Sequence, residues 1–354
     1  MSITTITSTT HEQILRVADP ACGLVGFIAI HSTALGPAAG GLRMRPYANE
    51  DEALTDVKRL SEGMTYKNAA AGLPLGGGKA VIMGDPATQK TPELLQCFGR
   101  AVEACAGRYW TAEDMGMTTA DMAELAKETK YVAGLAEGAF ASGDPSPITA
   151  RGIFNAIRRV ATHRFDDWTL KGKRISVQGL GNVGWNLCHR LKAAGAELIV
   201  TDINPDRVAL AVETFGATAV GLDEIYGVEA DIFAPCAIGG VLNIDTIPHL
   251  QVAAVAGGAN NQLATPEDAA ALHHQGILYS PDFVANGGGI INVATEILGI
   301  ENRVDWVDEK LTALDDTMEA ILVEAERRDV SPADVALEVV ARAIPAKDAQ
   351  APAA

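Results

Sequence analysis

The sequence predicts an α/β protein of two domains, and three observations lead to that fold class. A chain of 354 residues is longer than one hydrophobic core usually serves. After a turn-rich run at 142–147, apolar strands and helices alternate strictly, which indicates parallel strands joined by helical crossovers, the doubly wound plan. A glycine motif at 179–184 follows one of those strands and opens a helix. We expect an N-terminal α/β domain over 1–134 and a doubly wound domain over 135–327, with a cleft between them. C-terminal helices at about 328–354 would pack back on the first domain.

The first third of the chain contains an apolar strand followed by helices. Residues 23–30 form the strand-like run. From a start near Asn49, apolar residues recur at helical spacing, namely Ala53, Val57, Leu60 and Met64. A second helix at 92–105, a short strand at 108–111 and a third helix at 118–129 are expected to follow.

The second half carries the alternating pattern. Strands are expected at 174–178, 197–202, 231–234 and 252–256, with helices at 182–194 and 205–214 between them. The turn-rich run at 142–147 is the expected crossing between domains. Helices follow Asn286, and the Ala- and Pro-rich end from Ala346 is expected to be a frayed tail.

Composition excludes several classes of protein. A formal charge of −17 argues against nucleic acid or an anionic membrane surface as a partner, because both require clustered lysine and arginine. No signal peptide or membrane-spanning run is evident, so we expect a cytoplasmic protein. Five cysteines without a Cys-x-x-Cys pair favour reduced thiols, and the histidines lack metal-ligand spacing. We expect no metal.

Lys67 and Lys79 lie in a segment, 63–84, that contains no acidic residue. We expect Lys67 at the end of a helix and Lys79 after three glycines at the head of a strand, so that both ammonium groups converge to receive an anion. Burial and a like-charged neighbour would lower a lysine pKa towards neutrality and make that lysine a base. Two alternatives stay open at this point. Each lysine could bury its methylene groups and keep its ammonium group in water. Alternatively, an acid elsewhere in the chain could pair with either lysine.

Gly179, Gly181 and Gly184 form a Gly-x-Gly-x-x-Gly motif in a strand-to-helix context. The first glycine allows the tight turn, the second lets a pyrophosphate approach the backbone, and the third lets the helix pack on the strand. Asp202 ends the next strand, where a carboxylate accepts hydrogen bonds from two ribose hydroxyls and repels a 2′-phosphate. The motif predicts a Rossmann domain that binds NAD rather than NADP. The alternative is a turn that binds nothing.

Two adjacent acids, Glu113 and Asp114, follow the expected strand at 108–111 in a loop that contains Gly116. Such an acid could carry a proton to or from a reacting nitrogen or oxygen. It could equally be a helix-capping aspartate ahead of Thr118. A hydride acceptor together with an anion-holding, base-bearing segment suggests oxidation of a small carboxylate-bearing molecule.

The chain resembles the amino acid dehydrogenases of the glutamate, leucine, phenylalanine and valine group, and most closely its leucine-type members. The matching stretches run in order through almost the whole chain, at 35–41, 64–67, 76–79, 111–114, 146–149, 179–184, 233–236, 257–261 and 281–288.

This resemblance implies reversible, NAD-dependent oxidative deamination of an L-amino acid to its 2-oxo acid and ammonia, in a homo-oligomer. It implies that Lys67 holds the substrate carboxylate, that Lys79 activates water through a depressed pKa, and that Asp114 carries protons. Asn260 would lie between nicotinamide and substrate. Further substrate contacts are expected at Gly40, Gly41, Ala39, Met64, Ile290 and Val293. Cofactor contacts are expected at Thr149 (near the carboxamide), Gly179, Gly181, Asn182, Val183, Gly184, Asp202, Cys236, Ala237, Ala259 and Asn260.

The resemblance also bears on substrate choice. Glutamate-specific members carry a lysine at the position of Ala39 and a hydroxyl at that of Val293, so an apolar substrate side chain is expected here, with leucine and branched chains favoured. A small residue at the position of Ala39 is typical of phenylalanine-type enzymes, which have a wider pocket for the substrate side chain. Ile290 and Val293, by contrast, would narrow the far side of that pocket. One methylene is worth only ~1–3 kcal/mol of discrimination, so these opposed features predict a broad specificity. Leu42 replaces the usual threonine, with no effect that the sequence explains.

Two functions from other classes fit these motifs less well. A non-catalytic NAD-binding regulator would not require Lys67, Lys79 and Asp114 to be intact. A lysine Schiff-base enzyme without hydride transfer would leave the dinucleotide motif unexplained.

Overall fold

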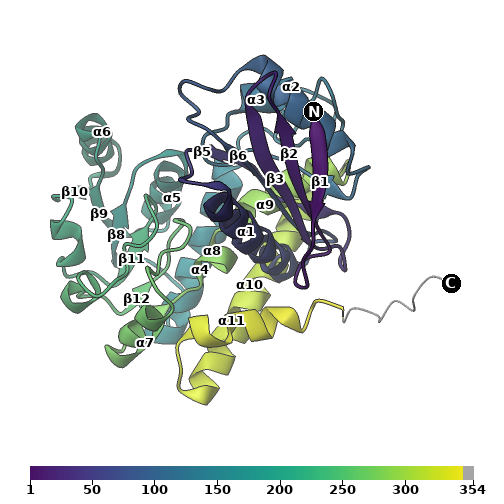
Figure 1. The fold of residues 1–354 in the computed structure, drawn as a ribbon. Helices are drawn as coiled ribbons and strands as arrows, with labels where there is room; N and C mark the ends of the chain where they lie inside the picture. Colours follow the sequence, from purple (N-terminus) through teal and green to yellow (C-terminus); the bar gives the residue numbers. More distant parts are fainter. Residues whose placement is uncertain (346–354) are drawn as a thin grey trace. The chain divides into compact units, whose positions relative to one another are not determined.

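The computed structural model describes residues 1–345, which form two compact units (Figure 1). The first unit comprises Met1–Asp144, Ile290–Val307 and the described chain from Ala341 on. The second comprises Pro145–Gly289 and Asp308–Val340. No helix within residues 1–345 has the length and apolar character needed to span a membrane.

The first unit is built on a mixed sheet. Its strands are β1 (Ser2–Ile6), β2 (Gln13–Asp19), β3 (Leu24–Ser32), β4 (Ala38–Ala39), β5 (Leu42–Arg45), β6 (Gly76–Met83) and β7 (Tyr109–Trp110). The order is β1-β2-β3-β6-β4-β7, and β5 also pairs with β6. The neighbours from β1 to β6 along this path are antiparallel, whereas β4 and β5 pair in parallel. The helices are α1 (Glu50–Ala70), α2 (Pro92–Glu103) and α3 (Thr119–Leu125).

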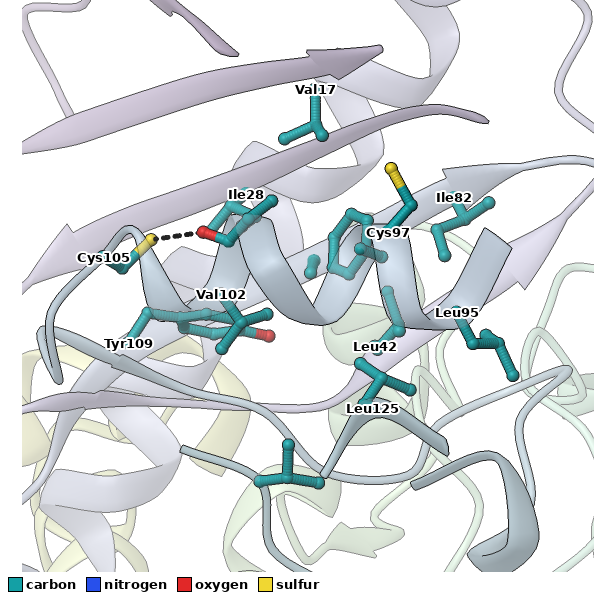
Figure 2. Close-up of a cluster of buried hydrophobic side chains, with 14 of the residues drawn as sticks. Val17, Ile28, Leu42, Ile82, Leu95, Cys97, Val102, Cys105, Tyr109 and Leu125 are labelled. Carbon is teal, nitrogen blue, oxygen red and sulfur yellow. Dashed lines mark hydrogen bonds between the residues drawn. The ribbon is translucent and has the colours of Figure 1, made fainter. Parts of the chain in front are cut away.

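Alternating residues along these strands face two different helical layers. Ala80 and Ile82 of β6 join Leu42 and Met44 of β5 in a core with α2 and α3, part of which Figure 2 shows. Val81 of β6 packs in a separate cluster with residues of α1. Because successive side chains of a strand point to opposite faces, the odd-numbered residues of β5 and β6 face α1. This alternation decides which side chains can meet the lysines.

The second unit contains a six-stranded sheet in which every strand pair is parallel. Its strands are β8 (Arg174–Gln178), β9 (Glu197–Thr201), β10 (Thr218–Ala219), β11 (Ile232–Pro235), β12 (Ala254–Val255) and β13 (Leu278–Tyr279). The order β10-β9-β8-β11-β12-β13 places the switch point between β8 and β11. The predicted doubly wound plan is confirmed.

Helices make up much of the rest of the described chain, and those within Ile290–Val307 belong to the first unit. They are α4 (Ser146–Phe165), α5 (Asn182–Ala193), α6 (Pro205–Phe215), α7 (Glu267–His274), α8 (Asp282–Ala285), α9 (Gly288–Ile297), α10 (Arg303–Arg328) and α11 (Pro332–Ala341), with 3-10 turns at Glu224–Tyr226 and Ile247–His249. Ion pairs from α4 to α10, Arg159 with Asp315 and His163 with Glu319, attach the long C-terminal helix within the second unit.

The units have other boundaries than the predicted domains. The first crossing lies at 144/145, inside the run at 142–147 where the sequence predicted a crossing, rather than at the predicted domain boundary of 134/135. The Glu296 carboxylate accepts hydrogen bonds from the N–H groups of Gly134, Leu135 and Ser142, which keeps this segment with the first unit. The segment that returns to the first unit is mainly Ile290–Val307, whereas most of 308–340 belongs to the second. The predicted frayed tail from Ala346 lies outside the described residues.

Local predictions differ from the structure mainly at element ends. The expected strand at 252–256 is only Ala254–Val255, and the helix expected at 118–129 ends at Leu125. The N-terminal strands β1 and β2 were not anticipated, and β6 begins at Gly76, so Lys79 lies inside the strand. The three glycines are therefore strand residues.

Candidate active site

Lys79 is buried inside β6 on the face that α1 covers. Its residue exposure is only 5%, so its ammonium group does not reach water in the way the snorkelling alternative required. Burial, followed by the positive charges of Arg43 and Lys67, lowers the pKa of Lys79 from 10.5 to about 7, although Asp56 opposes this shift. A lysine in this state is neutral in a large fraction of molecules at pH 7.

Lys67 lies in the last turn of α1, as predicted, and is half-buried. The helix approaches β6 so closely that a Cβ on Gly77 would overlap Thr65 of α1. Only glycine permits this approach, which brings the Lys67 charge near enough to depress the pKa of Lys79. The two lysines therefore converge as the sequence predicted.

Asp114 is the acidic partner of Lys79 and comes from the loop after β7. Its Oδ2 forms an ion pair with Lys79 Nζ, and its Oδ1 accepts a hydrogen bond from the Met115 N–H at 2.5 Å. The helix-capping alternative is wrong, because Thr118 caps α3 in a capping box with Asp121. The acid that the lysine segment lacks thus arrives from a loop distant in sequence.

Arg43 is a member of this cluster that the sequence analysis missed. It lies on β5, between two core residues, and its Nε and Nη2 are each 3.4 Å from Asp114 Oδ1. Its Nη1 donates to Asp56 Oδ2 of α1 at 3.1 Å. The alternation of Leu42, Arg43 and Met44 would have signalled a cation on the face opposite the core, had the pairing of β5 with β6 been known.

The backbone of Gly40 and Gly41 lies against the same cluster. A Cβ on Gly40 would be 2.9 Å from Met64 Cγ, and one on Gly41 would be 2.9 Å from Asp114 Cβ. Ala39 is fully buried on β4, with its carbonyl accepting from Asn68 of α1. Ile290 and Val293 also belong to the first unit and are half-buried. Their roles in substrate binding stay predictions.

The three glycines of the motif in the second unit have different surroundings, as the sequence predicted. Gly179 adopts a φ of +96° and packs on Ala237, and a Cβ on Gly184 would overlap the Gly179 carbonyl. At Gly181, by contrast, a Cβ would meet nothing within 4 Å. The first and third glycines are thus needed for the turn and the packing, while the second borders open space at the N-terminus of α5.

Asp202 follows β9 and stands beside this loop. Its Oδ2 accepts from the Leu180 N–H at 2.6 Å and its Oδ1 from the Asn204 N–H at 2.8 Å. The carboxylate therefore joins the glycine loop to the end of the second strand. Both the loop and the acid lie where an adenosine ribose is bound in doubly wound folds.

The remaining predicted cofactor residues follow strand ends or open helices. Cys236 and Ala237 follow β11, the Cys236 N–H donates to Gln178 of β8, and Thr149 lies in the first turn of α4. Ala259 is buried, Asn182 opens α5, and Val183 follows it on that helix. The structure does not test their contacts with a cofactor.

Asn286 is a second residue that the sequence analysis did not assign. Its Nδ2 donates to Asn260 Oδ1 at 2.8 Å, and its exposure is 6%. Its own Oδ1 is buried and has no hydrogen-bond partner among residues 1–345. Asn286 therefore orients the amide of Asn260 and offers a free acceptor beside it.

Potential metal ligands gather at a different place. Within the described chain, Asp19, Cys22 and Cys97 have ligand atoms within 4.8 Å of one another. Cys97 Sγ already donates to Asp19 Oδ2, and Asp19 also accepts from Ala21 N–H. These groups satisfy one another, and none belongs to the predicted site.

Comparison with known proteins identifies the family. Residues 11–131 match the model of the Glu/Leu/Phe/Val dehydrogenase dimerisation domain, and residues 142–204 and 206–344 match that of the Glutamate/Leucine/Phenylalanine/Valine dehydrogenases. The chain belongs to the Glu/Leu/Phe/Val dehydrogenase family. It is therefore an amino acid dehydrogenase, an enzyme that catalyses oxidative deamination. The family that the sequence motifs indicated is confirmed.

Several relatives of this dehydrogenase are similar over most of their length. A leucine dehydrogenase from Geobacillus stearothermophilus is 50% identical over 320 residues, which cover 90% of this chain and 87% of that protein. A phenylalanine dehydrogenase from Lysinibacillus sphaericus is 50% identical over 294 residues, or 82% and 77% of the two chains. The crystal structure of L-tryptophan dehydrogenase from Nostoc punctiforme superposes with a TM-score of 0.84 at 42% identity, covering 95% and 96%.

Proposed function

We propose that this amino acid dehydrogenase uses NAD to convert an apolar L-amino acid, leucine or another branched-chain residue foremost, reversibly to its 2-oxo acid and ammonia. The observation that carries the proposal is the buried Lys79, with its pKa near 7, paired with Asp114 and close to the second cation Lys67. The extensive similarity to leucine dehydrogenases supports the choice of substrate.

The cluster accounts for each proton transfer of the reaction. Lys67 holds the substrate carboxylate by charge, which removes that anion from water without requiring a proton. Neutral Lys79 takes a proton from the water that attacks the iminium carbon, and so becomes the ammonium that Asp114 already contacts. Asp114 in turn passes protons to and from the substrate nitrogen and the carbinolamine. Loss of ammonia then leaves the 2-oxo acid.

The second unit supports NAD as the cofactor, which when bound supplies the hydride acceptor. The open space at Gly181 and the N-terminus of α5 fit a diphosphate, because free backbone N–H groups and the helix dipole attract anions. The Asp202 carboxylate fits two ribose hydroxyls and disfavours a 2′-phosphate. Asn286 orients Asn260 in the same unit.

The residues that the family resemblance places around the substrate side chain are all apolar. Ala39, Met64, Ile290 and Val293 all belong to the first unit and offer no charge to a second carboxylate. An aromatic substrate is the alternative, favoured by the small Ala39 and by the 50% identity to a phenylalanine dehydrogenase. Broad activity on apolar amino acids reconciles both features.

A panel of L-amino acids tests the proposal. Purified protein is incubated with NAD and each amino acid, and NADH absorbance is followed. We expect the largest kcat/KM for leucine, isoleucine or valine, with measurable activity on phenylalanine and none on glutamate. No reduction with any apolar amino acid would exclude the proposal. Turnover lost in Lys79→Ala, with NAD binding retained, separates an enzyme from a non-catalytic NAD-binding regulator.

A glycine substitution tests the cofactor assignment separately. In Gly181→Ala the added methyl enters open space, and the φ of −66° suits alanine, so the protein should fold normally. If the diphosphate lies there, the dissociation constant for NAD rises at least tenfold while the unfolding midpoint stays unchanged. Equal NAD affinity in both proteins, measured by fluorescence titration, would place the diphosphate elsewhere.

Assembly and location complete the proposal. We propose a homo-oligomer, supported by the match of residues 11–131 to a dimerisation domain, and light scattering of the purified protein measures its mass. A cytoplasmic location is supported by the five cysteines, all of which are free thiols.

A further inference from the structure

Arg43 stands at the centre of a charge network that ends at the reacting lysine. The guanidinium is 14% exposed and lies between two carboxylates, Asp56 on α1 and Asp114 after β7. Asp56 is itself held by the Tyr47 hydroxyl at 2.8 Å and by Arg59 at 3.5 Å. The anchored Asp56 limits the positions that the Arg43 side chain can adopt.

The two oxygens of Asp114 are thereby given different partners. Oδ1 faces Nε and Nη2 of Arg43 and the Met115 N–H, while Oδ2 contacts Lys79 Nζ. A carboxylate held by a guanidinium edge and a backbone donor cannot rotate freely, because rotation would break several hydrogen bonds at once. Its second oxygen stays directed at Lys79.

Arg43 also acts on Lys79 through its charge. After burial, it is the largest cause of the lowered pKa of Lys79, ahead of Lys67. Lys67 and Asp56 of α1 and Asp114 of the loop are the other charged groups close to Lys79. Arg45 of β5 also lies on this face and pairs with Glu52 and Asp56 of α1. On the β3 side, Ala29 pairs with Lys79, and His31 is hydrogen-bonded to Thr65 of α1.

We propose that Arg43 is a positioning residue of the deamination reaction, which aims the Asp114 carboxylate at Lys79 and keeps Lys79 neutral at the working pH. This inference rests on the proposed function for its kinetic part. It extends that function by making the base and the proton carrier depend on one guanidinium that touches neither substrate nor cofactor.

Arg43→Gln and Arg43→Lys test the proposal, with Arg45→Gln as the matched control. Arg45 lies on the same strand and face and approaches Asp56 at 3.9 Å, but its ion-pair partners are Glu52 and Asp56, not Asp114. In Arg43→Gln the acid limb of the pH profile of kcat/KM should move to higher pH by on the order of one pH unit. Removing the cation beside Lys79 raises the pKa of that lysine. Arg45→Gln should leave that limb in place.

Arg43→Lys separates charge from geometry. A lysine keeps the positive charge but not the planar fork, so the acid limb should stay near its wild-type position while kcat falls about tenfold or more. The KM for the amino acid should change less than kcat in both variants, since Lys67 is untouched. An unmoved limb in Arg43→Gln, or wild-type kcat in Arg43→Lys, would overturn the proposal.

A titration without turnover keeps the two proposals distinguishable. Acetic anhydride modifies neutral amines, and mass spectrometry of the Lys79 peptide across pH reports its ionisation. The labelling curve should move to higher pH in folded Arg43→Gln, and an unmoved curve would overturn the role of Arg43. If the curve moves but no amino acid is oxidised by the wild type, the proposed function fails while the electrostatic role of Arg43 stands.

Discussion

Lys79 shows how one residue becomes a base by its surroundings. A lysine in water has a pKa of about 10.4 and is cationic at pH 7. Inside β6, burial removes the water that stabilises the ammonium, and Arg43 and Lys67 add repulsion. The Asp56 carboxylate opposes this shift by favouring the ammonium, and the balance leaves the pKa near 7.

The pH dependence of deamination follows from this balance. The proposed reaction uses Lys79 as the neutral amine, so protonation below its pKa of about 7 removes the base, and kcat/KM should fall as the pH drops below 7. Activity lost on acidification should return fully at pH 8. Stopped-flow rates measured across about pH 5.5–9 trace this acid limb of the pH profile. In Lys79→Ala the rate should be about 10²–10⁴-fold lower and the limb absent; a persisting limb would assign it to another group.

Leu42 illustrates a residue whose role the sequence could not explain. Its side chain is fully buried in a core cluster that includes Phe98 and Leu125, on the face of β5 opposite Arg43. Figure 2 shows Leu42 within this cluster. We expect Leu42→Thr to lower the free energy of unfolding by about 2–4 kcal/mol, because a hydroxyl replaces buried methyl groups. Ratios of kcat/KM among apolar amino acids should stay the same. A changed ratio without a change in stability would place Leu42 in the pocket instead.

At the scale of elements, the packing of α1 on β6 builds the lysine pair. Three successive glycines open β6, and the second of them faces the helix. The missing side chain lets the helix backbone lie directly on the strand, so that Lys67 in the last turn of α1 comes near Lys79, two positions beyond Gly77 on the same face of β6. Gly77 thus serves helix–strand packing, whereas Gly76 lies against the Ser32 carbonyl and Gly78 against the Tyr109 ring.

Gly77→Ala tests this packing. The new methyl would overlap Thr65 Oγ1 and its backbone N–H, so α1 must shift away from β6. We expect a loss of at least about 3 kcal/mol in unfolding free energy together with a large rise in KM, as Lys67 moves relative to Lys79. Chemical denaturation and steady-state kinetics measure both.

Gly63→Ala is the control within the same helix. A Cβ there meets nothing within 4 Å, and alanine is favoured over glycine in a helix by about 1 kcal/mol. This variant should be slightly more stable than wild type with unchanged kinetics. Equal behaviour of the two variants would contradict the close-packing argument.

At the scale of the whole molecule, the chain passes repeatedly between its two units. Glu296 of α9 secures one of these passages, since its carboxylate accepts from three backbone N–H groups and the Ser142 hydroxyl. Residues 134–142 thereby stay with the first unit although the second begins at Pro145.

Glu296→Ala should release the segment 134–142. Removing the acceptor leaves several N–H groups without a partner, each lost bond costing about 1–3 kcal/mol where it is shielded from water. Limited proteolysis should then cut this segment at least several-fold faster, as measured by mass spectrometry of the fragments. Glu301→Ala, an exposed glutamate of the same returning segment, should not change the rate. Equal cleavage in both variants would show that other contacts hold the segment.

The sequence by itself determined the features that arise from local order. Strand and helix periodicity, the glycine motif with Asp202, and the acid-free segment around Lys67 and Lys79 depend on residues close in the chain, so the doubly wound unit and the lysine pair could be predicted. Only the family resemblance assigned the role of base to Lys79 and that of proton carrier to Asp114. Element ends and the N-terminal strands β1 and β2 were not predicted.

Only the tertiary structure decided which distant residues meet. Asp114 is 35 residues from Lys79, and Arg43 is 71 residues from Asp114. Their meeting depends on β5 pairing with β6 and on which face of each strand α1 covers. Shifting that register by one residue would turn Arg43 into the core and Leu42 towards the lysines. The pairing of strands is a long-range property, and for that reason the roles of Arg43 and Glu296 could not be seen in the sequence.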